Sequence, residues 1–534
     1  MKKKIFIFFG AIIVTSLMIS SVSAININQI NNDKKIIESL IGPPPNIEWE
    51  KTYTSTHNDY GLSTDQTSDN GYIIAGVRSE NTEYNEILVI KTDQNGNKQW
   101  EKTFGEGIPN NIQQTSDNGY IISSIKYIEA QEIQSKLIKI SSNGNQVWSK
   151  TYLGDSEFDC IKEVWQTSDE GYILIGAKMN GLIDSDIWLI KTNSQGNIQW
   201  EKTYDNSELL TTYSDSGLSV WELNSGGYII AGITTKIALI DSYTNVWLIK
   251  TDANGNKLKE NTFGETFSMA MWSANSVRET QEGGFIVTGA RNRQSSKYNT
   301  YFWALKTDSN LNKKKTFEII PGIEKYEGFN IACPTYEGGF ILIGQGSTID
   351  PPDISSYTKL VKLNTNLYEE WHIDFGVNDD NMYNAIKPTT DHGFIIAGGN
   401  NGNTKLLKLE KENLPPNKPN KPSGSASGTP GTSYEYTSST TDPENNQIYY
   451  KFSWGDGSYS EWLGPYNSGT TVKTSHNWDA KGTYKIQVKA KDTGEHESEW
   501  SDSLSVNMPR PKAATNTWIK NIFKTFMNKF GLLQ

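Results

Sequence analysis

The segment DNGYIIAG at 69–76 returns as DNGYIISS at 117–124, as DEGYILIG at 169–176 and as DHGFIIAG at 391–398. The glycine before the aromatic residue marks seven copies of this unit: Gly71, Gly119, Gly171, Gly227, Gly284, Gly339 and Gly393. Successive copies are 48 to 57 residues apart. A second unit follows the first, as in IKTDQNGNKQWEKTF at 90–104, and it becomes less regular in the later copies. The sequence therefore contains an array of seven repeats.

Each repeat is predicted to form four short strands. Asp-Asn-Gly and Asn-Gly suit tight hairpins, because asparagine and glycine accept a positive φ at little cost. Continuous apolar runs such as YII at 72–74 indicate sheets that are covered on both faces. Small sheets of this kind, repeated about every 50 residues, are the signature of a β-propeller. We therefore predict an all-β fold in which residues 47–410 form a seven-bladed β-propeller.

Two incomplete repeats predict how the ring closes. The last copy runs KLLKLEKENLPP at 405–416 and lacks its fourth strand, whereas IEWEKTY at 47–53 is a lone fourth strand with no third strand before it. Pairing the two segments completes one blade and removes two open strand edges. We therefore expect the segment around Trp49 to lie in the sheet that contains Leu406.

The N-terminus is typical of an export signal. Three lysines at 2–4 precede an apolar run at 5–19, and VSA at 22–24 supplies the small residues that signal peptidase cleaves after. We expect residues 1–24 to be a signal peptide, residues 25–46 to be a leader segment, and the protein to be extracellular or at the cell surface. An uncleaved membrane anchor is the alternative interpretation.

Composition limits the classes of partner. The 534 residues carry a net charge of -11 and a pI of about 5.2. Nucleic acid is not an expected partner, because phosphate binding needs a cationic surface. The two cysteines, Cys160 and Cys333, lie in different repeats. We predict that they do not form a disulfide, since so distant a pair rarely reaches the close Cα spacing that the bond needs.

A different module follows the repeats. Residues 411–415 are predicted to be a linker, and alternating apolar and polar residues in GTYKIQVKAKD at 482–492 predict a β-sandwich over 416–508. WGDG at 454–457 and HNWDAKGTYKIQVKAKD at 476–492 closely resemble the PKD domain of prokaryotic surface proteins and secreted enzymes. Trp454 stands where that family usually has phenylalanine. The resemblance implies an Ig-like sandwich.

The repeats themselves carry two resemblances. Over 47–410 they are similar to the propellers of exported archaeal and bacterial proteins with PKD modules, which implies location and architecture more than activity. The Asn-Gly-x-x-x-Trp unit also resembles the repeat of quinone-dependent dehydrogenases. Those propellers usually have eight blades and often an adjacent cysteine pair, whereas this chain has seven copies and no such pair. No cofactor is predicted.

The tail at 509–534 is predicted to contain an amphipathic helix that is too short to span a bilayer. The face predicted to contact a membrane surface consists of Trp518, Ile522, Phe523, Phe526 and Phe530, together with Ile519. The lysines at 520, 524 and 529 lie mostly off this face. The helix either lies in a membrane interface or docks on a protein surface.

Motifs for catalysis and metal binding are missing from the sequence. The five histidines have no metal-ligand spacing, and no HExxH, GxSxG, CxxC or P-loop is present. We therefore predict no catalytic residue and no bound metal.

One position in each repeat changes its chemistry from copy to copy. Six residues before the landmark glycines stand Asp65, Gln113, Trp165, Trp221, Arg278, Cys333 and Lys387. The residue before each is mostly apolar. We predict that Trp165, Trp221, Arg278 and Lys387 bind a ligand, the tryptophans by stacking on a sugar or peptide and the cations by holding an anion. The alternative is that these side chains fill gaps between unequal blades or face channel water.

These patterns together predict an exported cell-surface or secreted binding protein, with a non-catalytic propeller that recognises polysaccharide or protein. The first alternative is a secreted carbohydrate-active enzyme, a glycoside hydrolase or lyase on the same scaffold. The second is a structural protein of the cell envelope. No pattern indicates an oligomeric state.

Overall fold

The computed structural model describes residues 44–509 and 517–529. Within these ranges it omits 82–83, 129–132, 153–158, 181–183, 207–211, 238–241, 266–270, 293–299, 320–324, 337, 351–352, 377–381 and 412. The predicted signal peptide at 1–24 and nearly all of the predicted leader segment at 25–46 lie outside the described residues. The described chain is nearly all β, in antiparallel sheets, with one helix.

The described part of residues 47–409 forms seven four-stranded sheets, numbered here 1 to 7, of which sheets 3 and 4 join into one eight-stranded sheet. Sheet 1 consists of β2 (Asn58–Gln66), β3 (Tyr72–Asn81), β4 (Tyr84–Thr92) and β5 (Lys98–Glu106). Sheet 2 consists of β6 (Ile108–Gln114), β7 (Tyr120–Tyr127), β8 (Ile133–Ile140) and β9 (Gln146–Tyr152). Sheet 3 consists of β10 (Cys160–Gln166), β11 (Tyr172–Met179), β12 (Ser185–Thr192) and β13 (Ile198–Tyr204).

Sheet 4 consists of β14 (Thr212–Glu222), β15 (Tyr228–Ile237), β16 (Tyr243–Thr251) and β17 (Lys257–Phe263). Sheet 5 consists of β18 (Ser276–Glu279), β19 (Phe285–Asn292), β20 (Thr300–Thr307) and β21 (Lys313–Ile319). Sheet 6 consists of β22 (Lys325–Pro334), β23 (Phe340–Asp350), β24 (Asp353–Leu363) and β25 (Glu369–Phe375). Sheets 3 and 4 are joined by one parallel pairing, Ser185 with Ser214.

Sheet 7 contains β26 (Met382–Pro388), β27 (Phe394–Asn400) and β28 (Asn403–Leu409), and its fourth strand is β1 (Ile47–Tyr53). β1 runs antiparallel to β28, with Trp49 opposite Lys408 and Lys51 opposite Leu406. The predicted pairing of the Trp49 segment with the Leu406 sheet is therefore confirmed.

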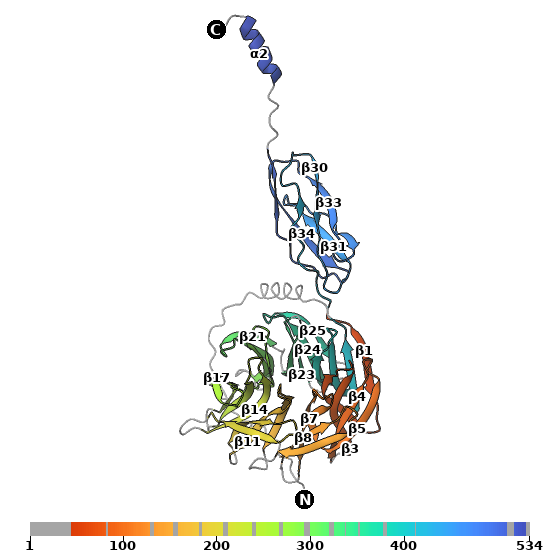
Figure 1. Cartoon of the computed structure of the whole chain (residues 1–534), viewed down its shortest axis with the longest axis vertical. Helices are drawn as coiled ribbons and strands as arrows, with labels where there is room; N and C mark the ends of the chain where they lie inside the picture. Colours follow the sequence, from red (N-terminus) through yellow and green to blue (C-terminus); the bar gives the residue numbers. More distant parts are fainter. Residues whose placement is uncertain are drawn as a thin grey trace. The chain divides into compact units, whose positions relative to one another are not determined.

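Neighbouring sheets pack through buried apolar side chains. Sheet 1 shares one cluster with sheet 2, built on Ile73 and Ile122, and another with sheet 7, built on Ile74 and Ile395. Similar clusters join sheets 2 and 3, 3 and 4, 4 and 5, and 5 and 6. Between sheets 6 and 7 the backbone N–H of Tyr383 donates to Thr358 Oγ1 at 2.9 Å. Each sheet thus packs on the next, and the last packs on the first, as the order of labels round the lower body of Figure 1 shows.

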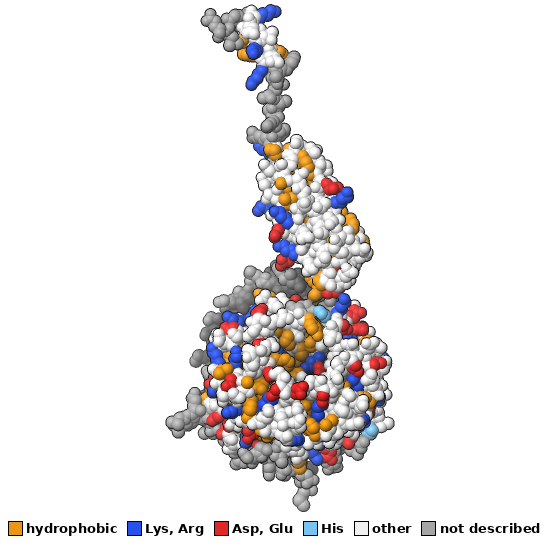
Figure 2. Space-filling view, in the orientation of Figure 1, with side chains coloured by type: hydrophobic (Ala, Val, Ile, Leu, Met, Phe, Trp, Pro, Cys, Tyr) orange, Lys and Arg blue, Asp and Glu red, His pale blue; other side chains and the backbone are white. Residues whose placement is uncertain are grey.

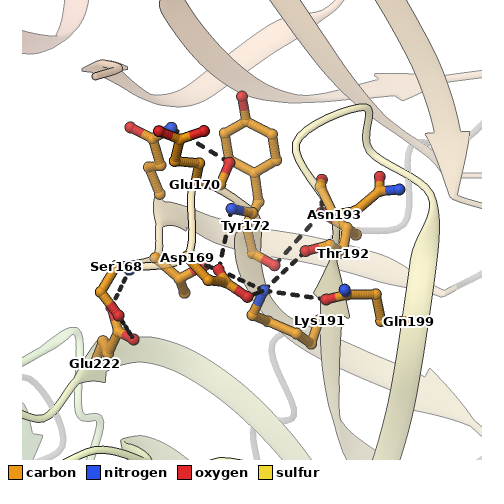
Figure 3. A network of polar contacts seen from close by, with 12 residues as sticks. Ser168, Asp169, Glu170, Tyr172, Lys191, Thr192, Asn193, Gln199 and Glu222 are labelled. Carbon is orange, nitrogen blue, oxygen red and sulfur yellow. Dashed lines mark hydrogen bonds and ion pairs between the residues drawn. The ribbon is translucent and has the colours of Figure 1, made fainter. Parts of the chain in front are cut away.

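A buried lysine links the two repeated units of one sheet. In sheet 3, Lys191 Nζ donates to Asp169 Oδ2 at 2.8 Å, to the Thr192 carbonyl at 2.9 Å and to Gln199 Oε1 at 3.2 Å (Figure 3). Burial raises the pKa of Asp169, but hydrogen bonds from Lys191 and Thr167 outweigh it and hold that pKa below its ordinary value. A buried ammonium needs such a partner, since leaving it unpaired is costly.

The same pair recurs through the chain. The matching ion pairs are Lys91 with Asp69, Lys139 with Asp117, Lys306 with Glu282, and Lys408 with Asp391. In sheet 7 the Nζ atom of the buried Lys408 also lies 3.3 Å from Oε2 of Glu48, which belongs to β1. Glu48 stands where Gln99 stands in β5 and Gln199 in β13, so β1 supplies the network of a fourth strand as well as its backbone.

The turns between the third and fourth strands of sheets 1 to 3 each contain a glycine that is covered by the tryptophan of the preceding sheet. Gly96 has a φ of +73°, and a Cβ added to it would lie 2.7 Å from the ring of Trp49. Trp100 covers Gly144 in the same way, and Trp148 covers Gly196. Only glycine satisfies both the left-handed backbone and the close ring.

Two further modules are described separately. Residues 423–508 form a sandwich of two sheets. One sheet consists of β29 (Ser423–Gly424), β30 (Ser433–Ser438) and β33 (Val472–Asn477). The other consists of β31 (Ile448–Ser453), β32 (Leu463–Tyr466), β34 (Gly482–Asp492) and β35 (Leu504–Met508). The core of the sandwich includes Trp454, Trp478, Ile486 and Val488. The helix α2 spans Thr517–Lys529. Among the described residues, no helix is long and apolar enough to cross a membrane.

On the part of Figure 2 that shows sheets 1 to 7, acidic and basic side chains are intermingled, so neither sign of charge dominates there. Cys160 and Cys333 are both buried free thiols, as expected from their positions in different repeats.

Candidate functional site

The seven variable positions occupy one equivalent place in the fold. Each is the penultimate residue of the first strand of its sheet: Asp65, Gln113, Trp165, Trp221, Arg278, Cys333 and Lys387. In three of the sheets this side chain bonds to the backbone of the next sheet. Asp65 Oδ2 accepts from Gln114 N at 3.0 Å, Gln113 Oε1 accepts from Gln166 N at 2.8 Å, and Cys333 Sγ donates to the Ile386 carbonyl at 3.4 Å.

The four predicted ligand-binding residues meet in one cluster. The rings of Trp165 and Trp221 pack edge to face, with centroids 4.9 Å apart and an interplanar angle of 73°. The Arg278 guanidinium carbon lies 4.7 Å from the Trp165 centroid and 4.8 Å from the Trp221 centroid. Lys387 Nζ lies 4.4 Å from the Trp165 centroid. We call these four residues the aromatic–cation cluster; they come from sheets 3, 4, 5 and 7.

A carboxylate that the sequence prediction missed holds the arginine in place. Glu163 Oε1 accepts from Arg278 at 3.1 Å, and Glu163 Oε2 accepts from Ser219 Oγ at 2.8 Å and from Val220 N at 2.9 Å. Arg278 also donates to Ser219 Oγ and to its own neighbour, the Val277 carbonyl. Since Arg278 is only 5% exposed, its charge is engaged within the protein and its main effect is to position the two rings.

Glu163 belongs to a second repeated position, eight residues before each landmark glycine. Polar residues at this position bond to the next sheet: Ser63 Oγ accepts from Ile112 N at 3.1 Å, Asn111 Nδ2 donates to the Val164 carbonyl at 2.9 Å, and Ser219 Oγ accepts from Val277 N at 3.2 Å. Polar residues at this repeated position, inside strands that are otherwise largely buried, were the sequence signal from which the role of Glu163 could have been predicted.

The accessible part of the cluster differs from its interior. Trp165 is 8% exposed, and its indole N–H is buried with no hydrogen-bond partner among the described residues. Trp221, Lys387 and Asp65 are partly exposed. Burial raises the pKa of Asp65, and the positive charge of Lys387 opposes this shift. The partly exposed residues of this region are therefore one tryptophan, one cation and one carboxyl group.

A separate group of acids lies where sheets 3 and 4 join. Asp184, Asp186 and Asp215 each have one buried carboxylate oxygen with no hydrogen-bond partner among the described residues. Burial is the main cause that raises all three pKa values, and mutual repulsion with Asp205 adds to it. The pKa of Asp215 is raised to about 6, and this residue is fully buried. A polymer cannot reach it for proton transfer.

In the described ranges, no group of three or more His, Cys, Asp or Glu side chains is arranged to hold a metal ion.

Comparisons with known proteins give distant similarities. No protein family matches the chain, and no curated protein matches it. The PKD domain of an M14-like peptidase from a Thermoplasmatales archaeon matches 18% of this chain and 100% of its own, at 50% identity and a TM-score of 0.18.

Two larger structures match more of the chain. A protein of unknown function from Dyadobacter fermentans matches 69% of this chain and 100% of its own, at 10% identity and a TM-score of 0.36. An endo-arabinase from Bacteroides thetaiotaomicron matches 53% of this chain and 98% of its own, at 8% identity and a TM-score of 0.26. Similarities at this level do not identify a function.

Replacing Glu163 tests how the aromatic–cation cluster is held. Glu163→Gln leaves the buried Arg278 without its counter-ion, so we expect the free energy of unfolding to fall by about 3 to 5 kcal/mol. Glu170→Gln, in the exposed turn of the same sheet, serves as the control and is expected to change it by less than about 0.5 kcal/mol. Denaturant titration measures both, and an equal effect of the two substitutions would contradict the assignment.

Asp215 makes stability depend on pH. Its folded pKa is raised from 3.8 to about 6, so the folded state holds this proton longer than the unfolded state. The stabilisation is complete below pH 3.8 and is lost as the pH rises through about 6, a loss of up to about 3 kcal/mol.

The substitution Asp215→Asn removes this titration. We expect the variant to match the wild type near pH 3.8 and to be more stable than it at pH 7, in denaturant titrations over that range. A difference between variant and wild type that does not change with pH would show that Asp215 is not the titrating group.

Proposed function

We propose that sheets 1 to 7 are the blades of a seven-bladed β-propeller. Three observations support this: the sheets pack in cyclic order, β1 completes the last sheet, and every first strand brings its penultimate residue to an equivalent place. The recurring period of 48 to 57 residues is typical of propeller blades.

We further propose that the chain is exported and acts at the cell surface or outside the cell. The export-type pattern at 1–24 supports this. The sandwich over 416–508, with its PKD-like motifs, is proposed to be a spacer or a second adhesive module.

The propeller is proposed to bind polysaccharide through the aromatic–cation cluster. The observation that carries this proposal is the meeting of Trp165 and Trp221 from two sheets, fixed by Arg278, with Lys387 beside them. Sugar rings pack on exposed aromatic surface, which the partly exposed Trp221 supplies here, and sugar hydroxyl groups bond to ammonium groups such as that of Lys387. Protein is the second ligand class, because the same aromatic and charged groups suit a peptide.

Binding without hydrolysis is better supported than catalysis. Glycoside hydrolysis commonly uses two carboxyl groups at the scissile bond. Of the two carboxylates described at the cluster, Glu163 is engaged by Arg278, Ser219 and Val220, and Asp65 accepts a hydrogen bond from the Gln114 backbone N–H, so both carboxyl groups already have partners within the protein.

Glycan and protein arrays with the purified protein test the proposal. Trp221→Ala is expected to weaken binding to the ligand that the arrays identify on the order of thirty-fold, as for a central tryptophan of an interface. Lys387→Gln is expected to weaken it several-fold while leaving the ring packing in place. Tyr459→Ala removes an aromatic side chain that is 57% exposed on the sandwich and is the matched control.

Two results would contradict the proposal. Unchanged affinity in Trp221→Ala and Lys387→Gln, with melting temperatures that show a folded propeller, would place the ligand elsewhere. Release of sugar from a polysaccharide by the wild-type protein would instead favour a carbohydrate-active enzyme.

A further inference from the structure

The helix α2 exposes its apolar side chains. Ile522 is 46% exposed, Phe523 65% and Phe526 57%. Between 520 and 529 every other described side chain is also exposed, except Met527, which is partly exposed. The predicted contact residues Trp518 and Phe530 lie outside the residues whose side chains the structure describes. A group of apolar side chains this exposed marks an interaction surface, since contact with water is unfavourable for such side chains.

The exposed apolar residues lie on one side of the helix. Ile522, Phe523, Phe526 and Met527 follow the spacing i, i+1, i+4, i+5, which brings their side chains to one face. Lys524 lies off this face, and Lys520 and Lys529 lie at its two edges. Figure 2 shows lysine and hydrophobic side chains together on this helix.

The charge of the helix points to one kind of occupant. Residues 517–529 contain three lysines and no aspartate or glutamate, whereas the whole chain has a net charge of -11. An anionic surface would repel most of this protein, so a short basic segment with an apolar stripe is the part suited to contact it. Long lysine side chains can keep their ammonium groups at lipid head groups while the aromatic rings enter the apolar boundary.

We propose that α2 lies in the head-group region of an anionic lipid bilayer and so attaches the protein to a membrane surface. The described helix has 13 residues, too few to span a bilayer. The attachment is therefore peripheral and reversible. It is separate from ligand binding by the propeller and does not depend on it.

Vesicle sedimentation with the full chain tests this proposal. We expect binding to vesicles of equal parts phosphatidylglycerol and phosphatidylcholine, and at least tenfold weaker binding to pure phosphatidylcholine. Each lysine near an anionic surface is worth roughly five-fold in affinity, so Lys520→Gln with Lys524→Gln should weaken binding roughly twenty-fold. Added salt should weaken binding further.

Matched variants separate the apolar face from the polar one. Phe523→Ser with Phe526→Ser is expected to reduce vesicle binding at least tenfold. Asn521→Ser with Asn528→Ser changes two exposed polar residues of the same helix and should leave binding unchanged. Affinity for the propeller ligand should be the same in both pairs, which distinguishes failure of this proposal from failure of the proposed function.

Three outcomes would overturn the proposal. They are no binding of the wild type to either vesicle, equal binding of the wild type to both vesicles, and full binding by the double phenylalanine variant. A lower melting temperature in that variant, without vesicle binding by the wild type, would show that the helix docks on the protein itself.

Discussion

The unpaired edge of β28 is the constraint on which the rest of the repeat array depends. The last repeat supplies three strands, and the third would present a row of free backbone donors and acceptors. β1 covers that edge from the other end of the array, with Trp49 opposite Lys408. Trp49 also packs on Tyr72 of sheet 1, with centroids 5.7 Å apart, as Trp100 packs on Tyr120 of sheet 2. One strand thus completes sheet 7 and joins it to sheet 1.

Closing the array brings distant side chains together. Glu163 and Arg278 are 115 residues apart in sequence, yet they form the ion pair that fixes the aromatic rings. Lys387, from sheet 7, reaches the ring of Trp165, from sheet 3. An open array of sheets, in which each sheet contacts only its neighbours, would not bring these two sheets together. The candidate site is therefore a consequence of the closure.

Sequence reasoning succeeded where the signal is local and repeated. The strands, the hairpins and the partner of the Trp49 segment follow from short motifs whose geometry is set by glycine, asparagine and apolar runs. The grouping of Trp165, Trp221, Arg278 and Lys387 at one position also came from the repeat, because equivalent positions in a cyclic array point toward one region.

Other features could not be predicted because they depend on contacts between sheets. Glu163 is an ordinary charged residue in its own repeat, and only its position beside Arg278 gives it a role. The shielding of Arg278, and the acidic group of Asp184, Asp186 and Asp215, likewise depend on how unequal sheets fit against each other. Lysines are expected on the surface from residue type alone. Buried lysines such as Lys191 are tolerated because the turn between the first and second strands of the same sheet supplies an aspartate.

The closure can be tested directly by a disulfide between Thr52→Cys and Lys405→Cys. These residues are directly opposite in the β1–β28 ladder, within the Cα spacing that a disulfide accepts, and the natural cysteines are buried. If β1 closes the array, the bond forms in the folded protein without denaturant, and the oxidised form is more stable than the reduced form by about 4 to 5 kcal/mol, because the bond closes a very long loop. Failure to form the bond under native conditions, or formation only with loss of stability, would contradict the account.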